Sequence, residues 1–182
     1  MYYKLHIYHG NGKGKTTAVT GLAVRALGAG LRVSIVYFDK GHRDEREHYA
    51  ERAILRGIEN CTLHPTGCER LLKAGGFRFG IMPEDLTEAQ RALKLSADLI
   101  ASEEQDILIL DEILAAVAYE LISEEEVMKL LELYDKSRHA ELVLTGHRVW
   151  PELIDRADLV TELKMVKHYF DTGLKARWGI DY

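Results

Sequence analysis

Short apolar runs alternate with amphipathic stretches along the whole chain. Runs rich in β-branched and aromatic residues predict strands over 5–8, 32–38, 61–64, 106–110, 141–146 and 159–163. Between them, apolar residues recur three or four positions apart, which predicts helices over 15–27, 44–56, 83–102, 113–121, 123–134 and 150–154. Strands that alternate with helices favour an α/β fold with a mostly parallel sheet of about six strands and helices on both faces.

A glycine-rich loop separates the first predicted strand from the first predicted helix. It consists of Gly10, Asn11, Gly12, Lys13, Gly14, Lys15, Thr16 and Thr17. The backbone N–H groups of such a turn, together with a helix N-terminus, attract anions. Lys15 is placed to reach phosphates and the Thr16 hydroxyl to face a magnesium ion. The usual G-x-x-x-x-G-K-[ST] pattern would need glycine in place of His9, so this is a shortened form of a nucleoside triphosphate site.

A second candidate site follows the apolar run 107–110. Four consecutive apolar residues predict a strand that is buried on both faces, and Asp111 and Glu112 come directly after it. In P-loop proteins this position holds magnesium, so Thr16, Asp111 and Glu112 are candidate metal ligands. Glu112 would act either as a direct ligand or as a base. The two carboxylates could also simply favour the dipole of the next helix, but the glycine-rich loop in the same chain favours the metal site.

The composition narrows the class of protein. The 182 residues suit one domain over 1–182. A net charge of −5 without a basic run argues against nucleic acid as a partner. We find neither a membrane-length apolar run nor a signal-peptide pattern, which predicts a cytoplasmic protein without a membrane association. Cys61 and Cys68 fit neither a zinc pair nor a disulfide framework, and we expect two reduced thiols.

Several separated motifs resemble one family. The shortened loop is similar to the phosphate loop of the P-loop type ATP:corrinoid adenosyltransferases. The resemblance continues in Phe38-Asp39-Lys40-Gly41, in Gly76-Phe77-Arg78-Phe79, in Asp111-Glu112 and in the closing stretch 166–182. It extends along nearly the whole chain and implies the RecA-like P-loop NTPase fold.

The resemblance also implies a reaction. The family transfers the 5′-deoxyadenosyl group of ATP to the cobalt of a Co(I) corrinoid and releases triphosphate, in the biosynthesis or salvage of adenosylcobalamin. Cobalt comes with the substrate, ATP is the co-substrate, and Mg²⁺ or Mn²⁺ is the expected cofactor. An electron donor such as a flavoprotein reductase and a homodimeric state are implied in the same way.

Roles for individual residues follow from the resemblance. Lys15 and Glu112 are candidate catalytic residues, and Lys40 and Arg148 join the loop in binding the nucleotide. Phe77 and Phe79 would lie against the corrin face, where they would exclude water and a lower axial ligand. From the residues alone, the two rings would be interpreted as ordinary core, and it is the resemblance that favours the corrin-facing role.

Three departures from the family pattern stand out. Phe79 occupies a position where the family often has tryptophan. Arg148 follows Thr145-Gly146-His147, one place later than the usual arginine. Only nine residues precede Gly10, so we expect this chain to lack the N-terminal arm that covers the corrinoid in some relatives.

Two other classes of function share part of these features. An ATPase or nucleoside kinase would need the loop and the acidic strand end, but not the glycine-aromatic segment. A corrinoid- or nucleotide-binding module would deliver its ligand without catalysis.

Overall fold

The computed structural model describes residues 3–41, 47–69, 78 and 80–182. The strands are β1 (Leu5–His9), β2 (Val33–Tyr37), β3 (Cys61–Pro65), β4 (Ile107–Asp111), β5 (Glu141–Gly146) and β6 (Leu159–Glu162). The helices are α1 (Lys15–Gly28), α2 (Ala50–Leu55), α3 (Pro83–Ser102), α4 (Ile113–Ala118), α5 (Glu124–Ser137), α6 (Pro151–Arg156) and the short 3-10 helix η1 (Tyr169–Thr172).

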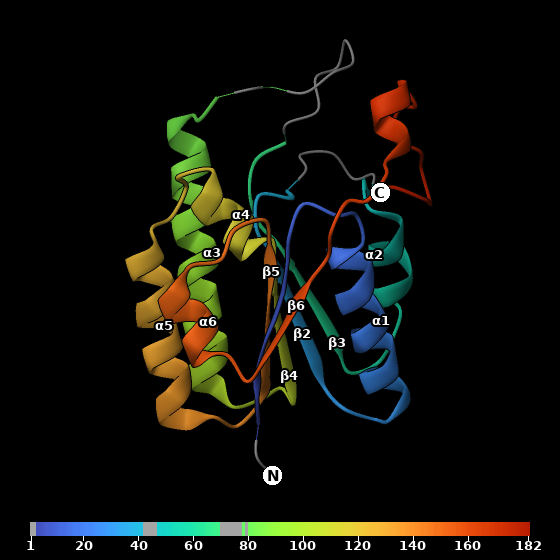
Figure 1. The fold of residues 1–182 in the computed structure, drawn as a ribbon. Coiled ribbons are helices and arrows are strands. Elements are labelled where there is room, and N and C mark those ends of the chain that lie inside the picture. Colours follow the sequence, from blue (N-terminus) through green and yellow to red (C-terminus); the bar gives the residue numbers. More distant parts are fainter. Residues whose placement is uncertain (1–2, 42–46, 70–77, 79) are drawn as a thin grey trace.

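The strands form one sheet in the order β3-β2-β4-β5-β1-β6, and every neighbouring pair is parallel (Figure 1). This confirms the predicted mostly parallel sheet. Because all strands run the same way, their carboxyl ends meet at one edge of the sheet. Ligands of open α/β sheets bind at that edge, and the loops after β1, β2, β4 and β5 converge there.

Helices cover both faces of the sheet, as predicted. In Figure 1, α1 and α2 lie on one side, and α3, α5 and α6 lie on the other. The strands alternate accordingly: Ile107 and Ile109 of β4 pack in the cluster around α1, whereas Leu108 and Leu110 pack in the cluster with the second helical layer. The central strand is therefore buried on both faces, which is what its unbroken apolar run predicts.

The helix expected over 123–134 continues to Ser137, and two other predicted helices are shorter than expected. The helix expected over 44–56 begins at Ala50. Residues 47–49 are described and are not helical, and residues 42–46 lie outside the described part of the chain. The Glu47 carboxylate accepts a hydrogen bond from the Tyr49 N–H at 3.2 Å, and Tyr49 is extended. This side-chain contact turns the chain before the helix starts.

The helix expected over 113–121 ends at Ala118. Glu120 has a φ of 57°, and the N–H groups of Glu120 and Leu121 donate to the carbonyls of Val117 and Ala116. This is the hydrogen-bond pattern of a Schellman helix end. Because a glutamate rather than a glycine or asparagine adopts the left-handed conformation, the sequence carries no signal for it.

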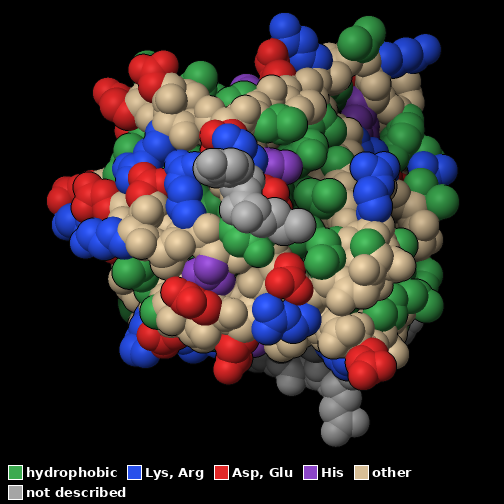
Figure 2. Space-filling model, turned by 90° about the horizontal axis from the view of Figure 1, so that it is seen from below, with side chains coloured by type: hydrophobic (Ala, Val, Ile, Leu, Met, Phe, Trp, Pro, Cys, Tyr) green, Lys and Arg blue, Asp and Glu red, His purple; other side chains and the backbone are tan. Residues whose placement is uncertain are grey.

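The opposite edge, where the strands begin, carries mixed charge. Figure 2 views the molecule from this end and shows acidic and basic side chains intermingled. Lys4 pairs with Asp158 and Arg32 with Asp106, which ties the starts of neighbouring strands together. Among the described residues, no helix combines the length and the apolar character needed to cross a membrane.

Candidate nucleotide site

The glycine-rich loop lies at the carboxyl edge of the sheet, between the end of β1 and the start of α1. Gly14 is the N-cap residue of α1 and has a φ of 116°, in the left-handed region that favours glycine. Gly10 and Gly12 are needed for a different reason, since a Cβ atom would lie 2.4 Å and 2.7 Å from the carbonyl oxygen of Leu163. The chain after β6 therefore packs directly on the loop.

Lys15 folds back over the loop. Its ammonium group donates hydrogen bonds to the carbonyl oxygens of Gly10 at 2.9 Å and Gly12 at 3.1 Å. Burial lowers the pKa of Lys15, and the nearby Glu112 carboxylate opposes that shift. The ammonium group thus lies within the turn that is predicted to cradle phosphates.

Asp111 is the centre of the polar cluster at the end of β4. Its carboxylate is fully buried and accepts hydrogen bonds from Thr16 Oγ1 at 3.2 Å and from Thr145 Oγ1 at 2.8 Å. Thr145 in turn accepts a hydrogen bond from the Glu112 N–H at 2.8 Å. The structure thereby brings together two of the three predicted metal ligands, Thr16 and Asp111, which are 95 residues apart in the sequence.

The ammonium group of Lys40 lies between these two ligands. Lys40 Nζ is 2.6 Å from Asp111 Oδ2 and 2.9 Å from Thr16 Oγ1. Burial would lower the pKa of Lys40, but attraction to Asp111 and Glu112 outweighs it and the pKa is raised. The point between a buried carboxylate and a hydroxyl thus already accepts a cation, and both donors are hard oxygen atoms of the kind that Mg²⁺ prefers. The donor set therefore fits the predicted metal.

Glu112 is close to the same charges. Burial raises the pKa of its carboxyl group, Asp111 adds to the shift, and Lys40 and Lys15 oppose it. Its backbone has a φ of 64° as the N-cap residue of α4, which directs the chain sharply away from the strand end. Two carboxylates and two ammonium groups therefore share this edge of the sheet.

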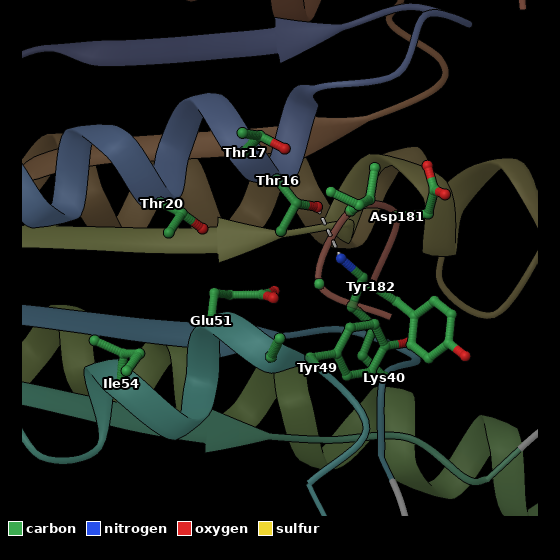
Figure 3. Close-up of a pocket in the computed structure, with 12 residues that line it drawn as sticks. Thr16, Thr17, Thr20, Lys40, Tyr49, Glu51, Ile54, Asp181 and Tyr182 are labelled. Atoms are coloured by element: carbon green, nitrogen blue, oxygen red, sulfur yellow. Dashed lines mark hydrogen bonds between the residues drawn. The ribbon is translucent and has the colours of Figure 1, made fainter. Parts of the chain in front are cut away.

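A cavity of about 430 Å³ opens beside the cluster. It is lined by Thr16, Thr17 and Thr20 of α1, by Lys40 and Tyr49, by Ala50, Glu51 and Ile54 of α2, and by residues 179–182. Figure 3 shows the threonines on one side, Glu51 and Ile54 on the other, and Asp181 and Tyr182 near the Lys40–Thr16 hydrogen bond. The first turn of α1, whose N-terminus attracts anions, therefore faces an open space.

The comparisons with known proteins identify the family. A family model described as "ATP:corrinoid adenosyltransferase BtuR/CobO/CobP" matches residues 3–182. The chain belongs to this family. It is 34% identical over 178 residues to the "Corrinoid adenosyltransferase" of Escherichia coli K12, covering 97% of this chain and 84% of that protein. It is 36% identical over 182 residues to the "Corrinoid adenosyltransferase CobA" of Salmonella typhimurium, covering 97% of this chain and 84% of that protein.

Solved structures support the fold. The flagellar accessory protein FlaH from Methanocaldococcus jannaschii aligns with a TM-score of 0.53 at 16% identity, over 87% of this chain and 70% of that one. ATPases 2 and 3 of EssC from Geobacillus thermodenitrificans align with a TM-score of 0.51 at 14% identity, over 98% of this chain and 35% of that one. At these identities the likeness concerns the fold alone. The predicted P-loop fold and the predicted adenosyltransferase family are both confirmed.

Some predicted site residues of this adenosyltransferase lie away from the cluster or outside the description. Arg148 pairs with Glu124 at the start of α5 at 3.1 Å and is largely exposed, so the structure does not bring it to Asp111. The Asn11 side chain accepts a hydrogen bond from the Met165 N–H at 3.1 Å, which gives it a role in fastening the loop. Phe77 and Phe79 lie outside the described residues, and their corrin-facing role stays a prediction.

The sequence interpretation missed two arginines around the site. Arg52 is fully buried, lies 3.9 Å and 4.2 Å from the ring centroids of Tyr37 and Tyr49, and donates to the Lys40 carbonyl at 2.9 Å. It therefore fixes the backbone that carries the Lys40 ammonium group. The apolar pattern of this short helix carried no signal for it, because the buried residues of α2 are Arg52 and Leu55.

The second arginine is Arg78, which belongs to the glycine-aromatic segment Gly76-Phe77-Arg78-Phe79. Its guanidinium binds the buried Asp85 carboxylate in a bidentate pair, at 2.8 Å and 2.6 Å. Asp85 also accepts the Met82 N–H at 2.8 Å and so caps α3. The pair ties residue 78 to the start of α3, next in sequence to both predicted corrin-facing rings.

Proposed function

We propose that this protein transfers the 5′-deoxyadenosyl group of ATP to the cobalt of a Co(I) corrinoid and releases triphosphate. The observation that carries the proposal is the family match over residues 3–182, in a chain whose phosphate loop meets Lys40 and Asp111 at one edge. The electron pair of Co(I) attacks C5′, a Co–C bond forms, and the bond from C5′ to the α-phosphate oxygen breaks. The triphosphate takes the electrons of that bond.

Charge stabilisation of the leaving group is the main task of the protein in this reaction. No protein nucleophile is needed because Co(I) is the nucleophile. Lys15 and the free N–H groups at the start of α1 point donors and positive charge at the loop, where charge develops on the triphosphate. Lys40 supplies a second buried ammonium group, which is held in place by Arg52.

We propose Mg²⁺ as the cofactor, with Mn²⁺ as a substitute, held by Thr16 and Asp111 together with phosphate oxygens. The cluster contains two ammonium groups and two carboxylates, so it offers little net positive charge to a triphosphate unless a further cation joins. Among the described residues, no three His, Cys, Asp or Glu side chains gather as metal ligands. Such a two-donor site is typical of Mg²⁺, which keeps waters and takes phosphates as its other ligands. When bound, the ion would neutralise charge on the phosphates.

The decisive experiment identifies the bond that breaks. With ATP, Mg²⁺ and a corrinoid reduced to Co(I), we expect adenosylcorrinoid and triphosphate in equal amounts by phosphorus NMR and absorbance, and neither without the corrinoid. Lys15→Ala is the control: loss of one contact to developing charge costs about 2.7–4 kcal/mol in the transition state. ADP and phosphate as the main products, at a rate independent of the corrinoid, would instead establish an ATPase.

We propose several further features on the basis of the family. Phe77 and Phe79 would face the corrin, an electron donor such as a flavoprotein reductase would supply Co(I), and the enzyme would act as a cytoplasmic homodimer. ATP would bind in the loop with C5′ directed toward the corrinoid.

A further inference from the structure

Residues 164–182, here called the closing segment, lie over the phosphate loop. In Figure 1 the segment sits beside the tops of α1 and α2, at the edge where the strands end. Asn11 and Lys13 of the loop hold the segment, and Gly12 holds the residue just before it. Asn11 accepts from Met165 N–H, the Gly12 N–H donates to the Leu163 carbonyl at 2.7 Å just before the segment, and Lys13 Nζ donates to the Ile180 carbonyl at 2.6 Å.

Asp181 organises the end of this segment. Its carboxylate accepts hydrogen bonds from the Tyr169 hydroxyl, from the Arg177 N–H at 3.0 Å and from Arg177 Nε at 3.2 Å. It also lies 3.4 Å from Lys13 Nζ, and its side chain is only 10% exposed. The hydroxyl of Tyr169 and then the neighbouring Arg177 hold the pKa of this carboxyl group well below its usual range, so it is ionised at neutral pH.

The segment forms part of the cavity beside the cluster. Residues 179–182 line it together with Thr16, Thr17 and Lys40, and Figure 3 shows Asp181 and Tyr182 at one end of the space. Lys13 does not line the cavity. Within the described structure, its hydrogen bond to the Ile180 carbonyl connects the phosphate loop to residues 179–182. Backbone hydrogen bonds shape this turn, from the Gly179 N–H to the Tyr182 carbonyl and from the Asp181 N–H to the Arg177 carbonyl, both at 2.8 Å. Lys13 and Asp181 connect the turn to the phosphate loop.

We propose that Asp181 is a positioning residue for ATP: through Lys13 it fastens residues 179–182 to the phosphate loop and so closes one side of the nucleotide cavity. The proposal rests on the proposed function, because it assumes that ATP binds beside Thr16. It assigns no contact between Asp181 and the reacting atoms. Its consequence is a defect in ATP binding without a defect in the chemical step.

The test compares Asp181→Asn with Asp171→Asn, which makes the same change at an exposed carboxylate of the same segment. Calorimetric titration with Mg·ATP, without corrinoid, gives the affinity, and steady-state assays give kcat and both KM values. We expect Asp181→Asn to weaken ATP binding about tenfold, the loss expected for one charged hydrogen bond. Its kcat, its KM for the corrinoid and all constants of Asp171→Asn should match the wild type.

A double-mutant cycle with Lys13→Met tests whether Asp181 acts through Lys13. The double variant should bind ATP no more weakly than Lys13→Met alone, and Asp181→Glu, which keeps the charge, should recover most of the affinity. Additive losses would overturn the proposal. So would tighter ATP binding in Asp181→Asn, since Lys13 would then be a phosphate ligand that Asp181 restrains.

The outcomes separate this inference from the proposed function. If the wild type binds ATP and forms adenosylcorrinoid while Asp181→Asn behaves like Asp171→Asn, only the role of Asp181 is wrong. If the wild type forms no adenosylcorrinoid, the proposed function itself fails. Should Asp181→Asn not fold, Lys13→Met removes the other half of the contact from a more exposed position and is expected to give the same tenfold loss.

Discussion

Lys40 decides the electrostatics of the site. A carboxylate as deeply buried as Asp111 is costly unless it is paired and hydrogen-bonded, and the Lys40 ammonium group supplies the charge while Thr16 and Thr145 supply donors. The same ammonium group lies where a metal ion would meet Thr16 and Asp111. Metal binding with ATP must therefore displace Lys40 from this point or move it toward the phosphates.

This arrangement predicts the behaviour of Lys40→Met, which keeps the chain length and removes the charge. Without metal, the unpaired Asp111 should lower the free energy of unfolding by up to about 3–5 kcal/mol. Mn²⁺ without nucleotide should then bind, as seen by the loss of the free Mn²⁺ EPR signal, and restore stability. In the wild type, Mn²⁺ without nucleotide should neither bind nor change the free energy of unfolding.

Lys94→Met is the matched control, because Lys94 pairs with Asp98 on an exposed face of α3. Its stability should change by less than about 1 kcal/mol, with or without metal. A Lys40→Met variant as stable as this control, and as indifferent to Mn²⁺, would show that Lys40 does not stand at the cation position.

The loop and the chain after β6 form one packed unit. The β1 loop passes so close to the Leu163 backbone that Gly10 and Gly12 leave no room for a side chain. The glycines that appear in the sequence as phosphate-binding residues thus also serve contacts within the protein. The Gly12 N–H, which donates to the Leu163 carbonyl, is engaged in the same way.

Gly12→Ala tests this packing. The added Cβ would meet the carbonyl oxygen of Leu163 at 2.7 Å and force the backbones apart, so we expect a loss of about 1–3 kcal/mol in urea unfolding. Gly28→Ala is the control, because nothing lies within 4 Å of its added Cβ in the last turn of α1. That change should stabilise the protein by about 0.4–1 kcal/mol. Equal stability of the two variants would contradict the close contact.

The helices show which structural features can be predicted from the sequence: those that depend on local hydrogen bonds. The capping box of Ser123 and Glu126 can be read from the S-x-x-E spacing in the sequence, because both of its hydrogen bonds are local. The early end of α4 was not predicted, because Glu120 adopts a conformation that its residue type disfavours. The role of Arg52 was also missed, because its two tyrosines and the Lys40 carbonyl come together only in the folded chain.

At the scale of the whole molecule, the site draws on residues at the ends of four strands. The loop follows β1, Lys40 follows β2, Asp111 ends β4 and Thr145 belongs to β5, and these strands are neighbours in the central part of the sheet. The sequence predicted the mostly parallel sheet. It did not predict the strand order, because any order of parallel strands would produce the same alternation of strands and helices.

A ligand that joins so many elements should stabilise the whole fold. At an ATP concentration 100 times the dissociation constant, binding adds about 2.7 kcal/mol to the free energy of unfolding. For a chain of this length each kcal/mol raises the melting temperature by roughly 2–4 °C, so we expect Mg·ATP to raise it by about 5–11 °C. Differential scanning calorimetry without corrinoid measures the shift. Lys15→Ala should show little of it at the same ATP concentration, since its ammonium group lies within the loop. An equal shift in both proteins would mean that ATP binds elsewhere on the molecule.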